Sequence, residues 1–298
     1  MFRRAWSRIV PAGLGAGLWP VDKLILAYFG FAALLILISW RTLPAAPVLL
    51  SLHFAGAALL LAAIRYPGRV SWWFRSWYPV VYVGLCFKEM EVLIPAVRRS
   101  RDADRWLADL DYSFWHANPT VWLERIQSPP LTEYLQVVYT LFVPAVLWIA
   151  FLLWIGRRHA EFQYYAFLIS LGFLVSYVGY LIVPARGPRF LLRHLQHQPL
   201  EGLWFFHALQ GGLDRLESIA YDCFPSGHTE LTVLAWWSSR KFASRLFWPY
   251  FAYTSSIIFA TVYLRYHYTI DVLAGAGVAA LLLIAGPSLY RKLNHKGA

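Results

Sequence analysis

Long apolar stretches alternate with short polar ones along most of this chain. Six stretches have the length, about 17 to 25 residues, that an α-helix needs to cross the hydrocarbon core of a bilayer. They lie at 24–40, 46–64, 135–155, 162–184, 247–264 and 272–289. This pattern predicts an all-α protein, a polytopic bundle of transmembrane helices. The first stretch is too long for a signal-peptide core, and we expect it to remain as an anchor.

Two further stretches are weaker candidates for membrane crossings. Segment 77–97 contains Lys88, Glu89 and Glu91, and segment 228–239 is short before Arg240 ends it. The prediction is eight crossings if both of them span, and six or seven if they do not.

The chain divides into three parts. Residues 1–97 form an N-terminal group of transmembrane helices, and residues 98–130 mix charged with aromatic side chains, as helices lying in a membrane interface do. Residues 131–298 hold the remaining spans, interrupted by one long loop at 185–225. Every candidate for chemistry lies in this third part.

Composition agrees with a membrane protein. The chain is 59% hydrophobic and 14% charged, against about 25% charged residues in a soluble domain. Its net charge of +11 does not indicate nucleic acid, because no basic and aromatic reading surface lies outside the spans. Lys and Arg concentrate instead in the short loops of one side, which marks that side as cytoplasmic. The motifs described below would then face outward. The two cysteines, Cys86 and Cys223, predict neither a disulfide framework nor a metal motif.

The first chemical motif is His267-Tyr268-Thr269-Ile270-Asp271 at the start of the last span. On a helix, residues four apart share a face, so His267 and Asp271 can meet. A carboxylate bonded to one ring nitrogen leaves the other free to attack an electrophile. The alternative is an interfacial histidine with an ordinary polar neighbour.

The second motif, Pro225-Ser226-Gly227-His228, also precedes a helix. Ser226 and Gly227 offer a hydroxyl and backbone N–H groups to an anion, aided by the helix dipole. His228 could protonate a leaving oxygen. The alternative is a simple helix cap by Ser226.

The third motif supplies positive charge. Arg186 and Arg189 flank Gly187-Pro188 at the outer end of the span 162–184 and could clamp phosphoryl oxygens. The alternative is that both arginines extend towards lipid headgroups.

Because spans alternate in direction, the three motifs are expected at one membrane face. Together they predict phosphoryl transfer through a phosphohistidine, with His267 as nucleophile, Asp271 as its orienting group and His228 as acid and base. Positioning and electrostatics carry most of such catalysis, so we expect no metal and no cofactor. Two alternatives remain: a transporter or channel whose path is lined by the same cluster, and a metal site made of His228, His267 and Asp271.

The motifs "GYLIVPARGPRF", "CFPSGHT" and "HYTIDVLAG" resemble those of the type 2 phosphatidic acid phosphatase superfamily, over roughly residues 100–290. The resemblance implies a six-helix core with extra N-terminal helices, and the histidine and aspartate roles given above. It is strongest to the branch of inositol phosphorylceramide synthases and related bacterial proteins. The family's usual lysine is missing at position 179, and its usual arginine is replaced by Thr261. Arg265 could take the place of that arginine in binding phosphate.

The expected substrate is therefore a lipid phosphate or phospholipid that enters from the membrane lipids. The phosphohistidine would be resolved by water or by an alcohol such as inositol, and the resemblance leaves hydrolase and transferase open. The expected location is a bacterial inner membrane, with the site on its periplasmic face.

Overall fold

The computed structural model describes residues 17–98, 102–216 and 221–294, and within them every regular element is a helix. This confirms the predicted all-α class. The N-terminal part contains α2 (Pro20–Ile38), α3 (Ala46–Arg65) and α4 (Arg69–Arg98). The larger part contains α7 (Pro129–Thr140), α8 (Phe142–Ile155), α9 (His159–Ile182), α12 (Gly227–Phe242), α13 (Phe247–Tyr263) and α14 (Thr269–Asn294).

Short helices occupy the segments between them. These are α5 (Asp104–Trp115), α6 (Pro119–Trp122), η1 (Leu123–Ile126), α10 (Pro188–Leu191), η2 (Arg193–Leu195), α11 (Phe206–Leu216) and η3 (Ser244–Leu246). Four helices begin with a proline, whose fixed φ suits a first helical turn that needs no N–H donor. These prolines are Pro20, Pro119, Pro129 and Pro188.

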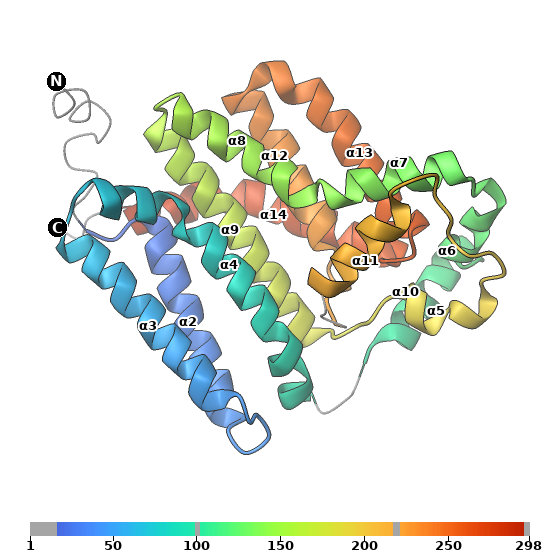
Figure 1. Ribbon diagram of the computed structural model, residues 1–298, viewed down its shortest axis with the longest axis horizontal. Coiled ribbons are helices and arrows are strands. Elements are labelled where there is room, and N and C mark those ends of the chain that lie inside the picture. Colours follow the sequence, from blue (N-terminus) through green and yellow to red (C-terminus); the bar gives the residue numbers. More distant parts are fainter. Residues whose placement is uncertain (1–16, 99–101, 217–220, 295–298) are drawn as a thin grey trace.

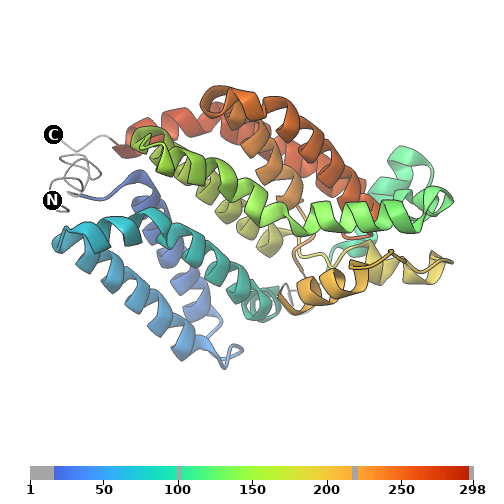
Figure 2. The ribbon, with the colours of Figure 1, turned by 45° about the horizontal axis from the view of Figure 1, so that its top comes forward.

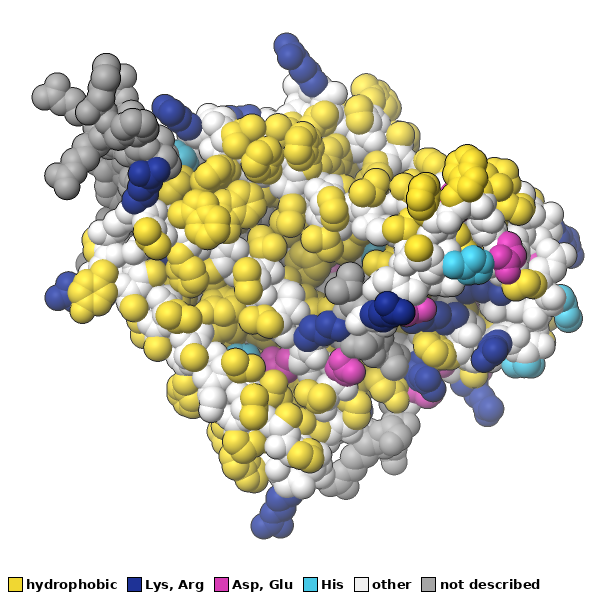
Figure 3. Space-filling view, in the orientation of Figure 1, with side chains coloured by type: hydrophobic (Ala, Val, Ile, Leu, Met, Phe, Trp, Pro, Cys, Tyr) yellow, Lys and Arg dark blue, Asp and Glu magenta, His cyan; other side chains and the backbone are white. Residues whose placement is uncertain are grey.

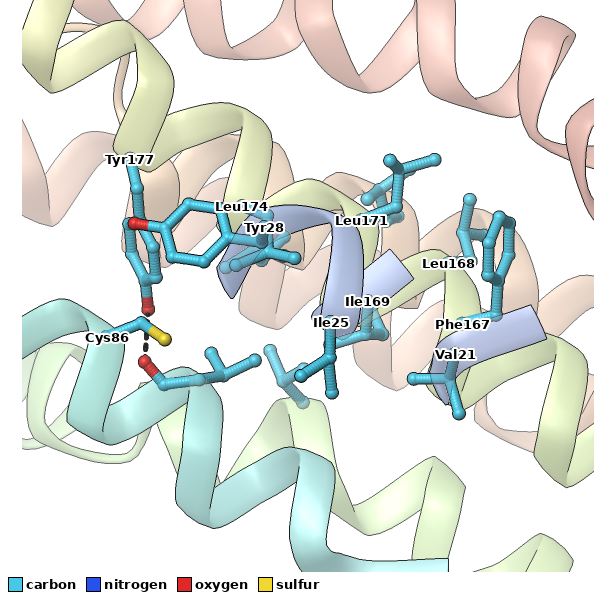
Figure 4. Close-up of a cluster of buried hydrophobic side chains, with 14 of the residues drawn as sticks. Val21, Ile25, Tyr28, Cys86, Phe167, Leu168, Ile169, Leu171, Leu174 and Tyr177 are labelled. Atoms are coloured by element: carbon cyan, nitrogen blue, oxygen red, sulfur yellow. Dashed lines mark hydrogen bonds between the residues drawn. The ribbon is translucent and has the colours of Figure 1, made fainter. Parts of the chain in front are cut away.

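The N-terminal helices pack against the larger part through α9. Val21, Ile25 and Tyr28 of α2 meet a row of apolar side chains on α9 (Figure 4). Within the N-terminal part, buried Asp22 accepts hydrogen bonds from Arg75 Nη2 at 2.5 Å and from the Tyr78 hydroxyl at 2.6 Å. A buried carboxylate needs such partners, and these two join α2 to α4.

Fewer helices are long and apolar enough to cross a membrane than the sequence pattern predicted. Within the described ranges four qualify, namely α2, α3, α9 and α14, and a fifth span results if α7 and α8, bent by 46°, are taken as one. The prediction of six to eight was too high by this criterion. The helices α12 and α13 have only 16 and 17 residues, and α4 carries the charges of segment 77–97. The protein is nevertheless built as an integral membrane protein.

The short helices α5, α6, α10 and α11 gather at one end of the bundle (Figures 1 and 2). Figure 3 shows a largely hydrophobic surface over α4 and α8, with a hollow between them, whereas charged side chains gather towards α10 and α11. This polar end holds the three motifs.

Candidate functional site

The two motif histidines lie beside each other. His228 is the second residue of α12, and His267 lies in the turn between α13 and α14. Their ring centroids are 5.8 Å apart, at an interplanar angle of 63°. This separation is within the reach of general acid–base chemistry on a group held between them.

Aromatic rings fix the position of His228. Its ring lies 4.3 Å from those of Tyr139 and Phe142, and Tyr139 stacks in turn on Tyr266 at 4.4 Å. Among the described residues, the Nε2 atom of His228 is buried without a hydrogen-bond partner. The ring is therefore held firmly by its faces, while one nitrogen remains available for proton transfer.

His267 is oriented differently from the sequence prediction. Helix α14 begins only at Thr269, so His267 precedes the helix instead of sharing a helical face with Asp271. Its Nδ1 lies 2.8 Å from the carbonyl oxygen of Cys223 and 3.6 Å from Oδ2 of Asp271. The first distance is a hydrogen bond and the second is too long for one. The backbone of Cys223 therefore sets the ring orientation, and Asp271 acts on it through its charge.

Cys223 and Asp271 form the support beneath His267. The Asp271 carboxylate accepts a hydrogen bond from the Cys223 thiol at 2.8 Å and another from the N–H of Tyr268 at 2.8 Å. Burial raises the pKa of the Cys223 thiol well above its ordinary value, which keeps it protonated as a donor.

Three of these side chains also resemble a metal cluster. Ligand atoms of Cys223, His267 and Asp271 lie within 4.8 Å of one another. His228, which the sequence analysis included in its metal alternative, is not part of this group.

Ser226 acts as the cap of α12. Its hydroxyl accepts hydrogen bonds from the N–H and hydroxyl of Thr229, and its own N–H donates to the carbonyl of Asp271 at 3.0 Å. Behind it, a Cβ on Gly275 would lie 2.4 Å from the Ser226 carbonyl oxygen. The first and second motifs are thus in direct backbone contact. The Ser226 hydroxyl takes the N–H of Thr229, and the N–H groups of Gly227 and His228 remain as anion donors, because a helix start leaves them without helical partners.

The three candidate arginines occupy different environments. Arg189 is half-buried, with Nη1 2.8 Å from Oδ1 of Asp214 and its guanidinium carbon 4.9 Å from the ring centroid of Tyr266. Arg186 is exposed, and its guanidinium lies over the ring of Phe190 at 4.4 Å.

The Arg265 guanidinium is directed towards η1 and the residues that follow η2. It contacts Glu124 at 2.9 Å, Gln196 at 3.0 Å and the carbonyl of Gln198 at 2.7 Å. These contacts tie the turn before His267 to residues near η1 and η2. In the structure, Arg265 therefore holds the turn before His267 in place.

Two carboxylates on α5 also support the site, and the sequence assigned a role to neither of them. Asp111 accepts hydrogen bonds from the N–H groups of Thr269 and Ile270, both at 2.8 Å, and so caps α14 from another helix. Asp104 accepts from the N–H groups of Arg186 and Gly187, at 2.8 and 2.7 Å. The signal in the sequence is their spacing of seven, which places both on one face of a helix.

Gly187 allows the third motif to approach the turn before His267. Its φ of 96° belongs to the region that favours glycine, and a Cβ there would lie 2.6 Å from the carbonyl oxygen of Tyr266. Beside it, the N–H of Arg189 donates to the carbonyl of Arg265.

Asp222, directly before the second motif, was also missed. Burial raises the pKa of its carboxyl, and the nearby His267 and Arg189 partly offset that effect by favouring its charged form. Asp222, Gly227 and His228 line one end of a cavity of about 500 Å³. The position of Asp222 next to a histidine motif was visible in the sequence, but its neighbours come from distant segments.

Comparisons with known proteins identify the family of this chain. Over 126 residues, 40% of this chain, the sequence is 32% identical to a PA-phosphatase related-family protein of Dictyostelium discoideum. The match covers only 22% of that relative's length. No solved structure matches the chain. A family model described as the PAP2 superfamily matches residues 105–285, a range that begins in α5 and includes all three motifs. Because this match covers more than half of the chain, the protein belongs to the PAP2 superfamily.

Proposed function

We propose that this protein is a lipid phosphatase or phosphotransferase that works through a phosphohistidine on His267. The observation that carries the proposal is the 5.8 Å approach of the His228 and His267 rings at the first turn of α12. Membership of the PAP2 superfamily and the resemblance to a PA-phosphatase related protein support a phosphate ester as substrate.

The hydrogen bond of His267 decides which atom attacks. Since Nδ1 is directed at the Cys223 carbonyl, Nε2 is the nucleophile that forms the bond to phosphorus. The phosphorus–oxygen bond to the lipid breaks, and His228, starting in its protonated imidazolium form, gives the proton on Nε2 to the departing oxygen. In the second step His228 takes a proton from water or an alcohol as that oxygen attacks the phosphohistidine and frees His267.

Arg189 and the first-turn N–H groups of α12 are the proposed ligands of the phosphoryl oxygens. Arg189 is half-buried and electrostatically coupled to Asp222, which lines the same cavity as His228. Its planar guanidinium suits phosphate. Arg186 and Arg265 are left out of this set, because Arg186 is exposed and the Arg265 guanidinium is held by Glu124 and its neighbours.

The decisive experiment is phosphate release or headgroup transfer from mixed lipids by the purified protein and by His267→Ala. We expect turnover by the native protein and none by the variant. Equal turnover by both proteins would refute the phosphohistidine proposal. Trapping a ³²P-labelled, acid-labile adduct on the native protein, absent from the variant, would establish the intermediate directly.

The acceptor is tested by adding an alcohol. The resemblance of "CFPSGHT" and "HYTIDVLAG" to inositol phosphorylceramide synthases favours transfer to an alcohol such as inositol. A new phosphodiester lipid that appears only with inositol would support the transferase, whereas free phosphate alone would support the hydrolase. The basic short loops favour an active site on the outer, periplasmic face of a bacterial inner membrane.

The cluster of Cys223, His267 and Asp271 favours a metal site as the second candidate. It is the weaker one, because the Cys223 thiol and the His267 Nδ1 already have protein partners. Loss of activity in excess chelator, restored by one equivalent of a divalent metal, would favour it. Activity that survives chelation would favour the metal-free reaction.

A further inference from the structure

The cavity that begins at His228 continues away from the motifs between membrane helices. Beyond Asp222 and Gly227 its walls come from α4, α8 and α9, and they are mostly aliphatic and aromatic. Representative lining residues are Val83, Phe87, Leu147, Ala166, Phe173 and Tyr177. A polar end joined to a long apolar body matches the shape and chemistry of a lipid phosphate.

The length of this cavity can be measured along α9. Its lining runs from Tyr180 to Phe162, which are 18 residues apart, or about 27 Å on a helix. The hydrocarbon core of a bilayer is about 30 Å thick. The apolar lining therefore extends well past the midplane, where the tail of an ordinary lipid in one leaflet ends.

One wall of the cavity is an addition to the family core. Helix α4 contributes lining residues from Ser76 to Lys88, yet it precedes the region 105–285 that matches the PAP2 superfamily. The Tyr177 hydroxyl of α9 donates to the carbonyl of Val83 at 2.9 Å and holds this wall in place (Figure 4). Val80 on α4 and Val143 on α8 are exposed lining residues, so the cavity opens sideways towards the bilayer.

We propose that this cavity, which we call the tail groove, binds the hydrocarbon chain of the substrate. The substrate then carries one chain long enough to pass the bilayer midplane. The chemical class is a long-chain polyprenyl phosphate. Helix α4, outside the catalytic core, then selects chain length. This inference rests on the proposed function and extends it to the lipid tail.

Two positions allow the groove to be shortened at different depths. A Cβ on Gly84 of α4 would meet nothing within 4 Å, so a phenylalanine there can extend into the groove near its polar end. Ala166 of α9 lies 14 residues, or about 21 Å, from Tyr180 and lines the deep end. Gly30 of α2 is the matched control, because it is exposed, equally unobstructed and outside the groove.

The experiment compares undecaprenyl phosphate with farnesyl phosphate, whose three isoprene units are too short to reach Ala166. For Ala166→Phe we expect the kcat/KM for undecaprenyl phosphate, divided by that for farnesyl phosphate, to fall at least tenfold. Excluding about two methylene groups from the groove is enough to lower kcat/KM by that factor. For Gly84→Phe we expect kcat/KM to fall for both lipids, and for Gly30→Phe we expect native values.

Failure of this inference can be distinguished from failure of the proposed function. His267-dependent turnover with an unchanged ratio in Ala166→Phe would overturn the tail groove alone. So would His267-dependent turnover of dioleoyl phosphatidate by a protein that accepts neither prenyl phosphate. If the native protein and His267→Ala turn over all of these lipids equally fast, both the tail groove and the proposed function are overturned.

Discussion

Asp111 and Thr269 are 158 residues apart, yet the Asp111 carboxylate receives both the N–H and the hydroxyl of Thr269, at 2.8 and 2.7 Å. Thr269 is the first residue of α14, two positions after His267. Helix α5 thus supplies the cap that α14 lacks in its own sequence.

The first prediction concerns this cap. Asp111→Ala should destabilise the protein by about 0.5–2 kcal/mol, the range measured for lost helix caps, and should lower turnover because the turn carrying His267 loosens. Thermal unfolding in detergent and kcat would report the two effects. Asp109→Ala is the control on the same helix, since Asp109 is exposed and its side chain has no hydrogen-bond partner among the described residues. Equal behaviour of the two variants would contradict the role of Asp111.

The second prediction separates the arginines of the third motif. Arg189→Gln should lower kcat/KM by about 10- to 100-fold, because hydrogen bonds to charged groups contribute about 1.5–3 kcal/mol. Arg186→Gln should stay near the native value, since that side chain is exposed. Steady-state kinetics on one lipid phosphate would test both variants. A larger loss from Arg186→Gln would reverse the assignment.

The third prediction removes proton transfer while preserving packing. In His228→Phe, a ring of similar size should still stack between Tyr139 and Phe142, so the unfolding temperature should change little. Turnover should fall about 100-fold or more, the usual contribution of a general acid and base. More than a tenth of native turnover in a folded variant would exclude His228 from that role.

The fourth prediction concerns the thiol beneath His267. Cys223 is 2% exposed, and burial raises the pKa of its thiol, so the reactive thiolate is scarce at neutral pH and remains scarce as the pH rises through the ordinary thiol range. N-ethylmaleimide should therefore leave the native protein unmodified at Cys223 and label it after unfolding, as mass spectrometry of the peptide that contains Cys223 would show. Rapid labelling of the folded protein, accompanied by inactivation, would contradict the buried thiol donor.

The apolar pattern predicted the helical class and the main membrane helices well. The segments 24–40, 46–64 and 272–289 each lie largely within α2, α3 and α14. Hydrophobic periodicity reports on the apolar surface of a single helix. These helices are apolar over nearly their whole length, where they face other helices or lipid. Hydrophobic periodicity does not report bends. The predicted span 135–155 is therefore divided between α7 and α8, which are bent by 46° relative to each other.

The motif residues could be predicted because each motif is local, whereas their partners could not. His267 was assigned a carboxylate from its own segment, but its nearer acceptor is a backbone carbonyl 44 residues away. Any residue can provide a backbone carbonyl, so no side-chain pattern reveals it. Arg265 was assigned to phosphate for the same reason, because Glu124 lies far away along the chain.

Gly275 of α14 lies directly against the Ser226 carbonyl at the start of α12. The distance between the two imidazole rings therefore depends on how closely α14 packs against α12. Even one methyl group at 275 would act as a wedge, moving the helix that carries His228 away from the turn that carries His267. The ring separation on which the proposed mechanism rests thus depends on a glycine that lies outside the contact between the two rings.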